Sequence, residues 1–341
     1  MRKLTLIILL MVTIVRAAAS ANEPEMLFGD ASSGKPFSKD PDVVRWKGKY
    51  YMYFSMPPAD QRSGWTIGVA ESDDLTNWKT VGEVGCDGDY EKKGRAAPCV
   101  VILKGKIHMF YQTYGNGPSD AICHAWSDDG IHFTKDPTNP VFHPNGDWNC
   151  GRAIDAEVIE RGGTTFLYWA TRDPDMKLQM LGVATADASS DYGRDAWRQA
   201  CDGPILKPAT DWEQSCIEAA SILMHDGLFY MFYAGAYNHE LQQIGAAVSR
   251  DGLHWNRLSD QPILPVGESG EWNAGESGHP GVFVDDDGQT YLFFQGKESP
   301  KANYLLSKVK VAWDGPYPYL IRPRDGKEFR LTDPIAIPPA E

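Results

Sequence analysis

A strand pattern that recurs five times, at intervals of about sixty residues, is the feature that most limits how this chain can fold. Each copy begins at a short anchor: Asp40, Ala97, Asp155, Glu218 and His279. From its anchor each copy runs to a glycine turn about eight or nine residues later, and then into a strand rich in aromatic residues. A period of this length, built from strands and turns, predicts a radial array of small sheets.

The repeat extends beyond this hairpin. A third strand pattern follows in most copies, for example at Ile67–Ala70 and Ile244–Ala247, and a polar turn and an aromatic residue come after it. Four short strands in each of five copies predict an all-β fold, a five-bladed β-propeller, that occupies residues 22–341 as a single domain. A β-sandwich is the alternative, but its hairpins are spaced more closely and do not repeat the same turn chemistry at this period.

Residues 1–21 have the pattern of a signal peptide. Arg2 and Lys3 supply the charged start, residues 4–15 are apolar, and Ala19-Ser20-Ala21 fits the small-residue cleavage pattern. The apolar run is too short to favour a membrane span, and an uncleaved anchor is the alternative. We therefore expect a secreted or periplasmic protein that has no membrane association after signal cleavage.

The bulk composition excludes one class of partner. The formal net charge is −13 and the chain has no cluster of Lys and Arg, which argues against nucleic acid and against a polyanion held by bulk charge. Six cysteines in an exported protein permit up to three disulfides, and no CxxC pair indicates a zinc site. We expect most of the 11 tryptophans and 15 tyrosines in the blade cores and a minority in a sugar-binding cleft.

Acidic residues stand at three of the five anchors: Asp40, Asp155 and Glu218. The inner strands of a propeller all run the same way, so their N-terminal ends meet at one mouth of the central channel. Carboxylates crowded in a partly dry mouth repel one another, and at least one keeps its proton near neutral pH. An acid and a base of this kind are the pair that glycoside hydrolysis needs. Arg95 and Arg152 come just before two anchors and are candidate ligands for the substrate or partners of the acids.

The order of the anchors resembles glycoside hydrolase family 43 and its five-bladed relatives, families 32, 62 and 117. The matching motifs are Asp40-Pro41, Ala97-Pro98, Ile154-Asp155-Ala156, Glu218 and Gly278-His279, and the resemblance covers about residues 28–320. It implies that Asp40 is the general base and Glu218 the general acid, while Asp155 orients the substrate and tunes the pKa of the acid. Ala96, Ala156 and Ala219-Ala220 depart from the Trp, Pro and Gly-Pro of the family, so the subfamily and the sugar stay open.

We expect an exported glycoside hydrolase that acts on a neutral or weakly charged plant or algal oligosaccharide or polysaccharide and inverts the anomeric centre. In this interpretation, like-charge repulsion from Asp155 keeps Glu218 protonated. Two alternatives remain: a family 117-like hydrolase of agar-derived oligosaccharides, and a non-catalytic propeller that binds carbohydrate. Acids at three of the five anchors favour catalysis, because a binding module does not need them.

Four other residues complete the expected site. The resemblance places His279 near the channel, where in several relatives this histidine contacts a calcium ion through water. His279 and Glu276 are therefore candidate substrate ligands, no organic cofactor is required, and a calcium ion in the channel is left open. Asp42 and Glu157, each two residues past an anchor, share its side of the strand, and we favour a structural, hydrogen-bonded role for both.

Overall fold

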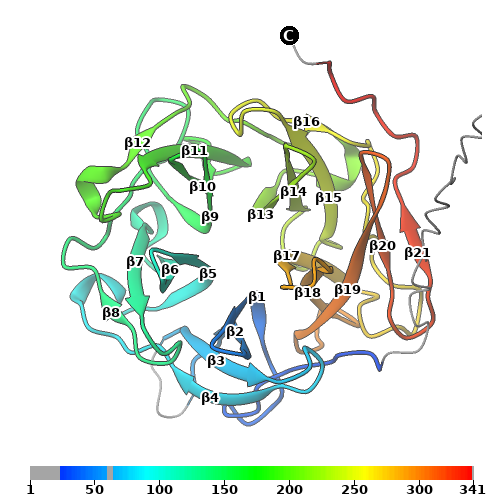
Figure 1. Ribbon diagram of the computed structural model, residues 1–341, viewed down its shortest axis with the longest axis horizontal. Coiled ribbons are helices and arrows are strands. Elements are labelled where there is room, and N and C mark those ends of the chain that lie inside the picture. The colour runs from blue at the N-terminus through cyan, green and yellow to red at the C-terminus, as the bar shows by residue number, and fades with distance from the viewer. Residues whose placement is uncertain (1–23, 60–63, 340–341) are drawn as a thin grey trace, which may run out of the picture.

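The structure, a computed structural model, describes residues 24–59 and 64–339. The predicted signal peptide, residues 1–21, lies outside the described residues. Five antiparallel sheets follow one another in chain order around a central axis (Figure 1). The predicted five-bladed β-propeller is therefore confirmed, and a β-sandwich is excluded.

Each blade is a continuous segment of the chain, and its first strand lies next to the axis. Blade one contains β1 (Lys39–Trp46), β2 (Lys49–Met56), β3 (Thr66–Ser72) and β4 (Lys79–Glu83). Blade two contains β5 (Arg95–Leu103), β6 (Lys106–Thr113), β7 (Ile122–Ser127) and β8 (Thr134–Lys135). Blade three contains β9 (Ile154–Arg161), β10 (Thr164–Arg172), β11 (Gln179–Asp187) and β12 (Arg198–Gln199). Blade four contains β13 (Ile217–His225), β14 (Leu228–Gly235), β15 (Gln243–Ser249) and β16 (Asn256–Arg257). Blade five contains β17 (Glu276–Val284), β18 (Thr290–Lys297), β19 (Leu305–Asp314), β20 (Tyr317–Ile321) and β21 (Glu328–Arg330).

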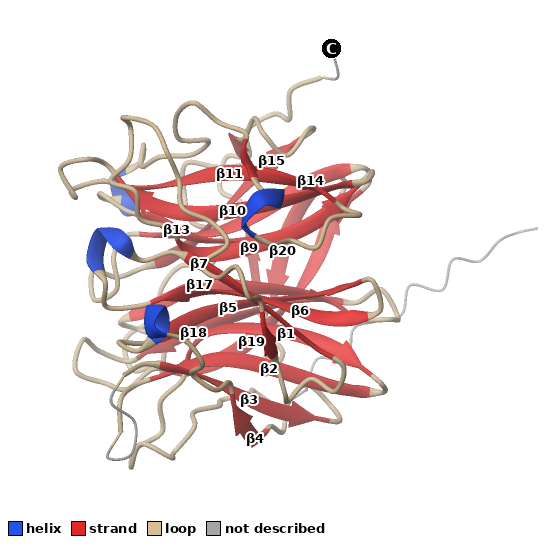
Figure 2. Ribbon diagram, turned by 90° about the vertical axis from the view of Figure 1, so that its left-hand side faces the viewer, coloured by secondary structure: helices blue, strands red, loops and turns tan. Residues whose placement is uncertain are grey.

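Strands make up most of the body, and the short helices lie toward one face (Figure 2). These are the 3₁₀ helices η1 (Asp89–Glu91), η2 (Gly117–Ser119), η3 (Arg194–Ala196) and η4 (Asp211–Glu213). Helices η1 and η4 come just before the inner strands β5 and β13, so they belong to the loops around the face where the inner strands begin. None of the helices in the described part of the chain has the length or apolar character needed to cross a membrane.

The aromatic strands predicted for each copy form the core between the blades. Tyr53, Phe110, Trp169, Phe232 and Phe293 belong to the second strands and are each 0% exposed. Burying a side chain of this size contributes roughly 1.5–3 kcal/mol, which makes these strands the main source of blade packing.

The polar turns predicted after the third strands join one blade to the next. The hydroxyl of Tyr53 in blade one donates to the carbonyl of Gly130 in the turn of blade two at 2.8 Å. Tyr168 in blade three makes the same bond to Gly252 of blade four at 2.9 Å. The recurring turn chemistry is therefore explained for these two turns, since each accepts a hydroxyl from the preceding blade.

The ring closes between blades five and one. Tyr50 of β2 donates its hydroxyl to Asp285 of the blade-five hairpin at 2.7 Å. The segment before blade one also crosses onto blade five, where Phe28 pairs with Leu306 of β19 and Ser307 donates to the carbonyl of Met26 at 2.6 Å. These contacts join the last blade to the first, and every blade remains one continuous segment of the chain.

Each inner strand is interrupted at the same place by a bulge in which two residues oppose one residue of the second strand. The first bulged residues are Asp40, Ala97, Asp155, Ala219 and His279, all at φ between 42° and 52°. Positive φ is strained for these residues, which is common where a fold holds functional side chains. Glu218 precedes its bulge and aligns with Lys39 of blade one. The prediction that three acids occupy equivalent positions is therefore wrong for Glu218.

All six cysteines are free thiols, so the structure contains none of the disulfides that the sequence permitted. Cys99, Cys123 and Cys216 are buried, as expected for core thiols. The fold is therefore held by packing and hydrogen bonds between blades.

Candidate active site

A cavity open to solvent lies at the mouth where the inner strands begin. All three predicted acids line it, together with His279 and Arg152. It is also lined by Lys39, Trp65, Ala96, Gln112, Tyr114, Ile154, Arg172, Gln179, Tyr237 and Asn238. The structure thus brings together acids that lie in three different blades.

Asp40 is held as an ionised carboxylate. Its backbone N–H donates to the side chain of Gln295 in blade five at 3.1 Å, which fixes the strained bulge. Its Oδ1 lies 3.0 Å from His279 Nδ1 and 3.8 Å from Lys39 Nζ. Burial alone would raise the pKa of Asp40, but the charges of Lys39 and His279 hold it below its usual range. An ionised carboxylate is what a general base requires.

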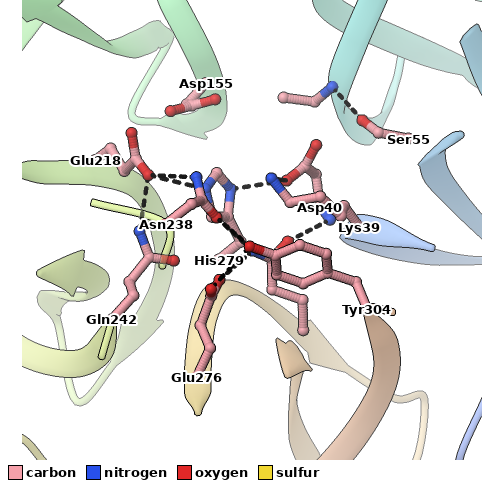
Figure 3. Close-up of polar contacts among 12 residues, drawn as sticks. Lys39, Asp40, Ser55, Asp155, Glu218, Asn238, Gln242, Glu276, His279 and Tyr304 are labelled. Atoms are coloured by element: carbon pink, nitrogen blue, oxygen red, sulfur yellow. Dashed lines mark hydrogen bonds and ion pairs between the residues drawn. The ribbon is translucent and has the colours of Figure 1, made fainter. Parts of the chain in front are cut away.

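His279 lies between Asp40 and Glu218 (Figure 3). Its Nε2 is 3.0 Å from Glu218 Oε1, as close as its Nδ1 is to Asp40. The Asp40 contact has an ion-pair distance, but the Asp40 oxygen does not meet hydrogen-bond geometry. Burial opposes a charged imidazole, yet the two carboxylates raise the pKa of His279 well above its usual value. The imidazolium is therefore the main proton carrier of the resting site.

Glu218 is almost fully buried, at 4% exposure, and is surrounded by donors. It accepts hydrogen bonds from Gln242 at 2.8 Å and from Gln179, as well as from His279. Burial would raise the pKa of Glu218, but His279, Lys39 and Gln242 together lower it. The expectation that Glu218 rests in its protonated form is therefore wrong, because a cationic imidazole occupies the space between it and Asp40.

The raised pKa expected for Glu218 is found on Asp155 instead. Burial and the charge of Glu218 raise the pKa of Asp155 to about 7. Its backbone N–H donates to Gln112 of blade two at 2.7 Å, while its Oδ2 is buried without a hydrogen-bond partner among the described residues. Like-charge repulsion between Asp155 and Glu218 is present, as predicted, but it raises the pKa of Asp155 instead of that of Glu218.

The predicted ligands divide into those that reach the mouth and those that do not. Arg152 and His279 line the cavity. Arg95 does not, because its guanidinium is bonded to the carbonyl of Val84 at 2.7 Å and to the hydroxyl of Thr66 at 2.7 Å in blade one. Its predicted contact with substrate is therefore wrong.

Glu276 is also outside the cavity, and its predicted role as a substrate ligand is wrong. It is 0% exposed, lies 3.3 Å from the ammonium of Lys297, and accepts hydrogen bonds from Tyr304 at 2.8 Å and Gln295 at 2.8 Å. Gln295 also accepts a hydrogen bond from the backbone N–H of Asp40, so Glu276 helps to position the base through Gln295. Glu276, which the sequence placed on a loop, is the first residue of β17.

Sequence reasoning missed several residues of the mouth. Lys39 is adjacent to Asp40, and that adjacency was a usable signal. Gln179, Gln242 and Arg172 come from strand ends or loops that no motif distinguished. Only the propeller geometry brings Gln179 and Gln242 to Glu218 and Arg172 to Gln179.

Below the mouth, the second residue after each bulge start forms a ring around the channel. Its members are Asp42, Cys99, Glu157, Ser221 and Gly281. In four places the side chain accepts a hydrogen bond from the backbone of the next blade: Asp42 from Val100 at 2.6 Å, Cys99 from Val158 at 3.2 Å, Glu157 from Ile222 at 2.6 Å and Ser221 from Val282 at 2.9 Å. At Gly281 there is no side chain, and the N–H of Val43 donates to Asp42 at 2.8 Å instead. The structural role expected for Asp42 and Glu157 is confirmed.

These residues do not fit a calcium ion in the channel. Calcium takes six to eight oxygen ligands, but both oxygens of Asp42 and one of Glu157 accept backbone N–H groups, and Cys99 offers sulfur. His279 faces a carboxylate from each ring nitrogen, and its raised pKa favours a proton on both. No step below depends on a metal ion.

A five-bladed propeller with Asp, Asp and Glu around one mouth is a recognisable class of protein. Residues 34–313 match the sequence profile of the glycosyl hydrolases family 43, and the chain belongs to this family. The resemblance drawn from the anchors is confirmed.

Individual relatives are distant. Sucrose-6-phosphate hydrolase of Bacillus subtilis (strain 168) is 25% identical over 274 residues, which cover 74% of this chain and 53% of that protein. The chain thus spans about half the length of this relative and smaller shares of other curated relatives that it matches. The crystal structure of a thermostable family-43 glycoside hydrolase has a TM-score of 0.67 at 21% identity, covering 90% of this chain and 99% of that one. An endo-1,4-beta-xylanase from Bacteroides thetaiotaomicron VPI-5482 has a TM-score of 0.68 at 22% identity, covering 86% and 96%. At these identities the structural likeness shows the fold.

Proposed function

We propose that this protein is a glycoside hydrolase that inverts the anomeric centre, with Asp40 as general base and Glu218 as general acid. The observation that carries the proposal is the imidazole of His279, which contacts Asp40 on one side and Glu218 on the other at 3.0 Å each. The two carboxylates are thus separated by a ring and two contacts. This separation supports inversion, which needs roughly 6.5–9.5 Å between the acids, more than the roughly 5–5.5 Å of a retaining pair.

In the proposed mechanism the proton for the leaving group comes from His279. Substrate binding brings the glycosidic oxygen next to Glu218, and the proton on Nε2 moves to Oε1 across the 3.0 Å contact. Glu218 then protonates the departing oxygen, while Asp40 takes a proton from the water that attacks the opposite face of the sugar. Asp155 stays beside the sugar, where its carboxyl group orients a hydroxyl and stabilises positive charge that develops on the ring.

The substrate is proposed to be a plant or algal oligosaccharide or polysaccharide. Trp65, Tyr114 and Tyr237 line the open cavity and offer ring faces to the C–H groups of a sugar. Export is part of the proposal and is supported by the signal-peptide pattern of residues 1–21. N-terminal sequencing of the protein from culture medium or periplasm tests the export, since the mature chain is expected to begin at residue 22.

The test of the activity is a screen of the purified protein on aryl glycosides and on plant and algal oligosaccharides, followed by NMR of the first product. Cleavage with the anomeric configuration inverted supports the proposal. Retained configuration would mean a covalent intermediate and a different role for Asp40. Binding without any cleavage would favour the non-catalytic propeller, and cleavage confined to agar fragments would favour the family 117-like alternative.

A further inference from the structure

The charge around the mouth differs from the charge of the whole chain. The protein carries a formal net charge of −13, yet besides His279 three lysine and arginine side chains line the mouth cavity: Lys39, Arg152 and Arg172. Potential in a cleft depends on the charges that line it, so the bulk charge does not describe what the mouth attracts. The cations therefore need an explanation of their own.

The position of Lys39 is explained by its contact with the carboxylate of Asp40. Its ammonium lies 3.8 Å from Asp40 and 5.0 Å above the ring of Tyr304, so it serves the base. The two arginines are different, because both belong to blade three and stand on either side of Asp155 in the sequence, Arg152 before β9 and Arg172 at the end of β10.

Arg172 is held in place but keeps donors free. Its Nε donates to Gln179 at 3.1 Å, and its guanidinium stacks over the ring of Tyr237 at 5.0 Å from the centroid. In the described part of the chain no carboxylate lies within ion-pair distance of it, and its terminal nitrogens have no hydrogen-bond partner. A stacked and oriented guanidinium with free N–H groups is suited to bind a planar oxyanion.

The guanidinium of Arg152 also has a donor without a hydrogen-bond partner among the described residues. Its side chain is 12% exposed and its Nε lies 3.5 Å from Asp120, but that nitrogen is buried and makes no hydrogen bond within residues 24–59 and 64–339. Arg152 lowers the pKa of Asp155, but burial and the charge of Glu218 outweigh it and keep that pKa raised to about 7. Burying a guanidinium with unsatisfied donors is costly unless a ligand completes it.

We propose that Arg152 and Arg172 form a subsite for an anionic substituent, a carboxylate or a sulfate ester, on the sugar that this site cleaves. The inference rests on the proposed glycoside hydrolase function and names its substrate class. Because Arg172 binds Gln179, and Gln179 binds Glu218, the anionic group lies on the acid side of the mouth, away from the water that Asp40 activates. A neutral substrate offers these donors hydroxyl groups but no opposite charge, and charge-assisted hydrogen bonds are the stronger ones.

The test compares matched substrates. Uronic-acid-containing oligosaccharides are assayed beside their carboxyl-reduced counterparts, and sulfated oligosaccharides beside desulfated ones. We expect kcat/KM to be about 100-fold higher for the anionic member of at least one pair, because each charge-assisted bond to an arginine contributes about 10-fold or more. The pair that responds identifies carboxylate or sulfate as the source of the charge.

Variants then assign the effect to the arginines. Arg172→Gln and Arg152→Gln are each expected to lower kcat/KM on the anionic substrate about 10- to 100-fold, mainly through KM, and to lower it far less on the neutral counterpart. Arg198→Gln is the matched control, since the side chain of this blade-three arginine bonds, among the described residues, only to the carbonyls of Asp195 and Trp197. Calorimetry of Asp40→Asn with the same oligosaccharides gives a readout that does not need turnover.

The outcomes separate this inference from the proposed function. Equal rates on charged and neutral counterparts, with equal losses in the arginine variants, overturn the anionic subsite and leave the hydrolase intact. Stimulation by inorganic phosphate, with release of a glycosyl phosphate, also overturns it, because the anion would then be a co-substrate. Anion-selective binding that depends on both arginines, without cleavage of any glycoside, supports the subsite and removes the hydrolase proposal.

Discussion

The mouth and the ring beneath it are built from the same five inner strands. Their residues are only two or three positions apart in sequence, yet the carboxyl groups at the two levels differ in electrostatic state. At the mouth, Asp40 and Glu218 are ionised, His279 is cationic, and Asp155 has an oxygen without a partner. In the ring, side chains accept backbone N–H groups from the next blade, and burial raises the pKa of Asp42 to about 7. Acids whose lone pairs are taken by the backbone hold the blades together, whereas acids that face other side chains and a cavity are free to move protons.

The largest effect is expected from removing the ionised pair at the mouth. Asp40→Asn and Glu218→Gln should each lower kcat at least about 1,000-fold, because general acid and base catalysis are each worth roughly 10²–10⁴. The loss in Glu218→Gln should be much smaller on an aryl glycoside with a good leaving group, which needs little protonation. Steady-state kinetics measures both effects.

Asp226→Asn is the control for these variants, since this acid lies in the exposed hairpin of blade four. Near-normal turnover by Glu218→Gln on a substrate with a poor leaving group would remove Glu218 as the acid.

The next largest effect should come from removing the imidazole of His279, the proton carrier, from beside the acid Glu218. His279→Gln should lower kcat about 100-fold and move the alkaline limb of the pH–rate profile toward acid. The pKa of His279 is raised by its two carboxylates, so the wild-type site keeps the proton to high pH, and without the imidazole Glu218 must hold it alone. An unchanged alkaline limb in a folded His279→Gln protein would show that His279 only positions the acids.

A smaller shift is expected from Asp155. The charges of Asp155 and His279 stabilise each other, so Asp155→Asn removes a negative charge that favours the protonated imidazole. The alkaline limb should therefore fall by about one pH unit, together with a loss of kcat. A limb that stays in place, or rises, would mean that Asp155 does not influence the proton used in catalysis.

The smallest effect should come from the ring, and it should appear in stability instead of turnover. Burial raises the pKa of Glu157 well above its usual value, so between its unfolded and folded pKa the folded state binds the extra proton. Stability is then lost as pH rises toward the folded pKa. Glu157→Gln, which mimics the protonated form, should be about 1–2 kcal/mol more stable than wild type at pH 9 and nearly equal at pH 5.

Urea denaturation at the two pH values measures this difference, and Glu160→Gln on the exposed side of β9 is the control. Equal pH dependence in wild type and Glu157→Gln would mean that the ring acid is ionised in the folded protein.

The fold was predictable because its signal is local and repeated. Each anchor, glycine turn and aromatic strand can be recognised within a few residues, and five copies reinforce one another. The acids Asp40, Asp155 and Glu218 were found in the same way. Arg95 and Glu276 were placed wrongly, because proximity to an anchor in sequence does not say whether a side chain turns into the mouth or toward the neighbouring strands.

The sequence alone determined the five blades, the family and the three acids that meet at the mouth, since strand periodicity and anchor residues are written in short segments. Only the tertiary structure decided which group carries the proton and which cations reach the mouth. A pKa depends on the charges and donors within a few ångströms. Here those neighbours come from other blades, as in the bond from the backbone of Asp40 to Gln295, 255 residues away. No local pattern contains such a contact.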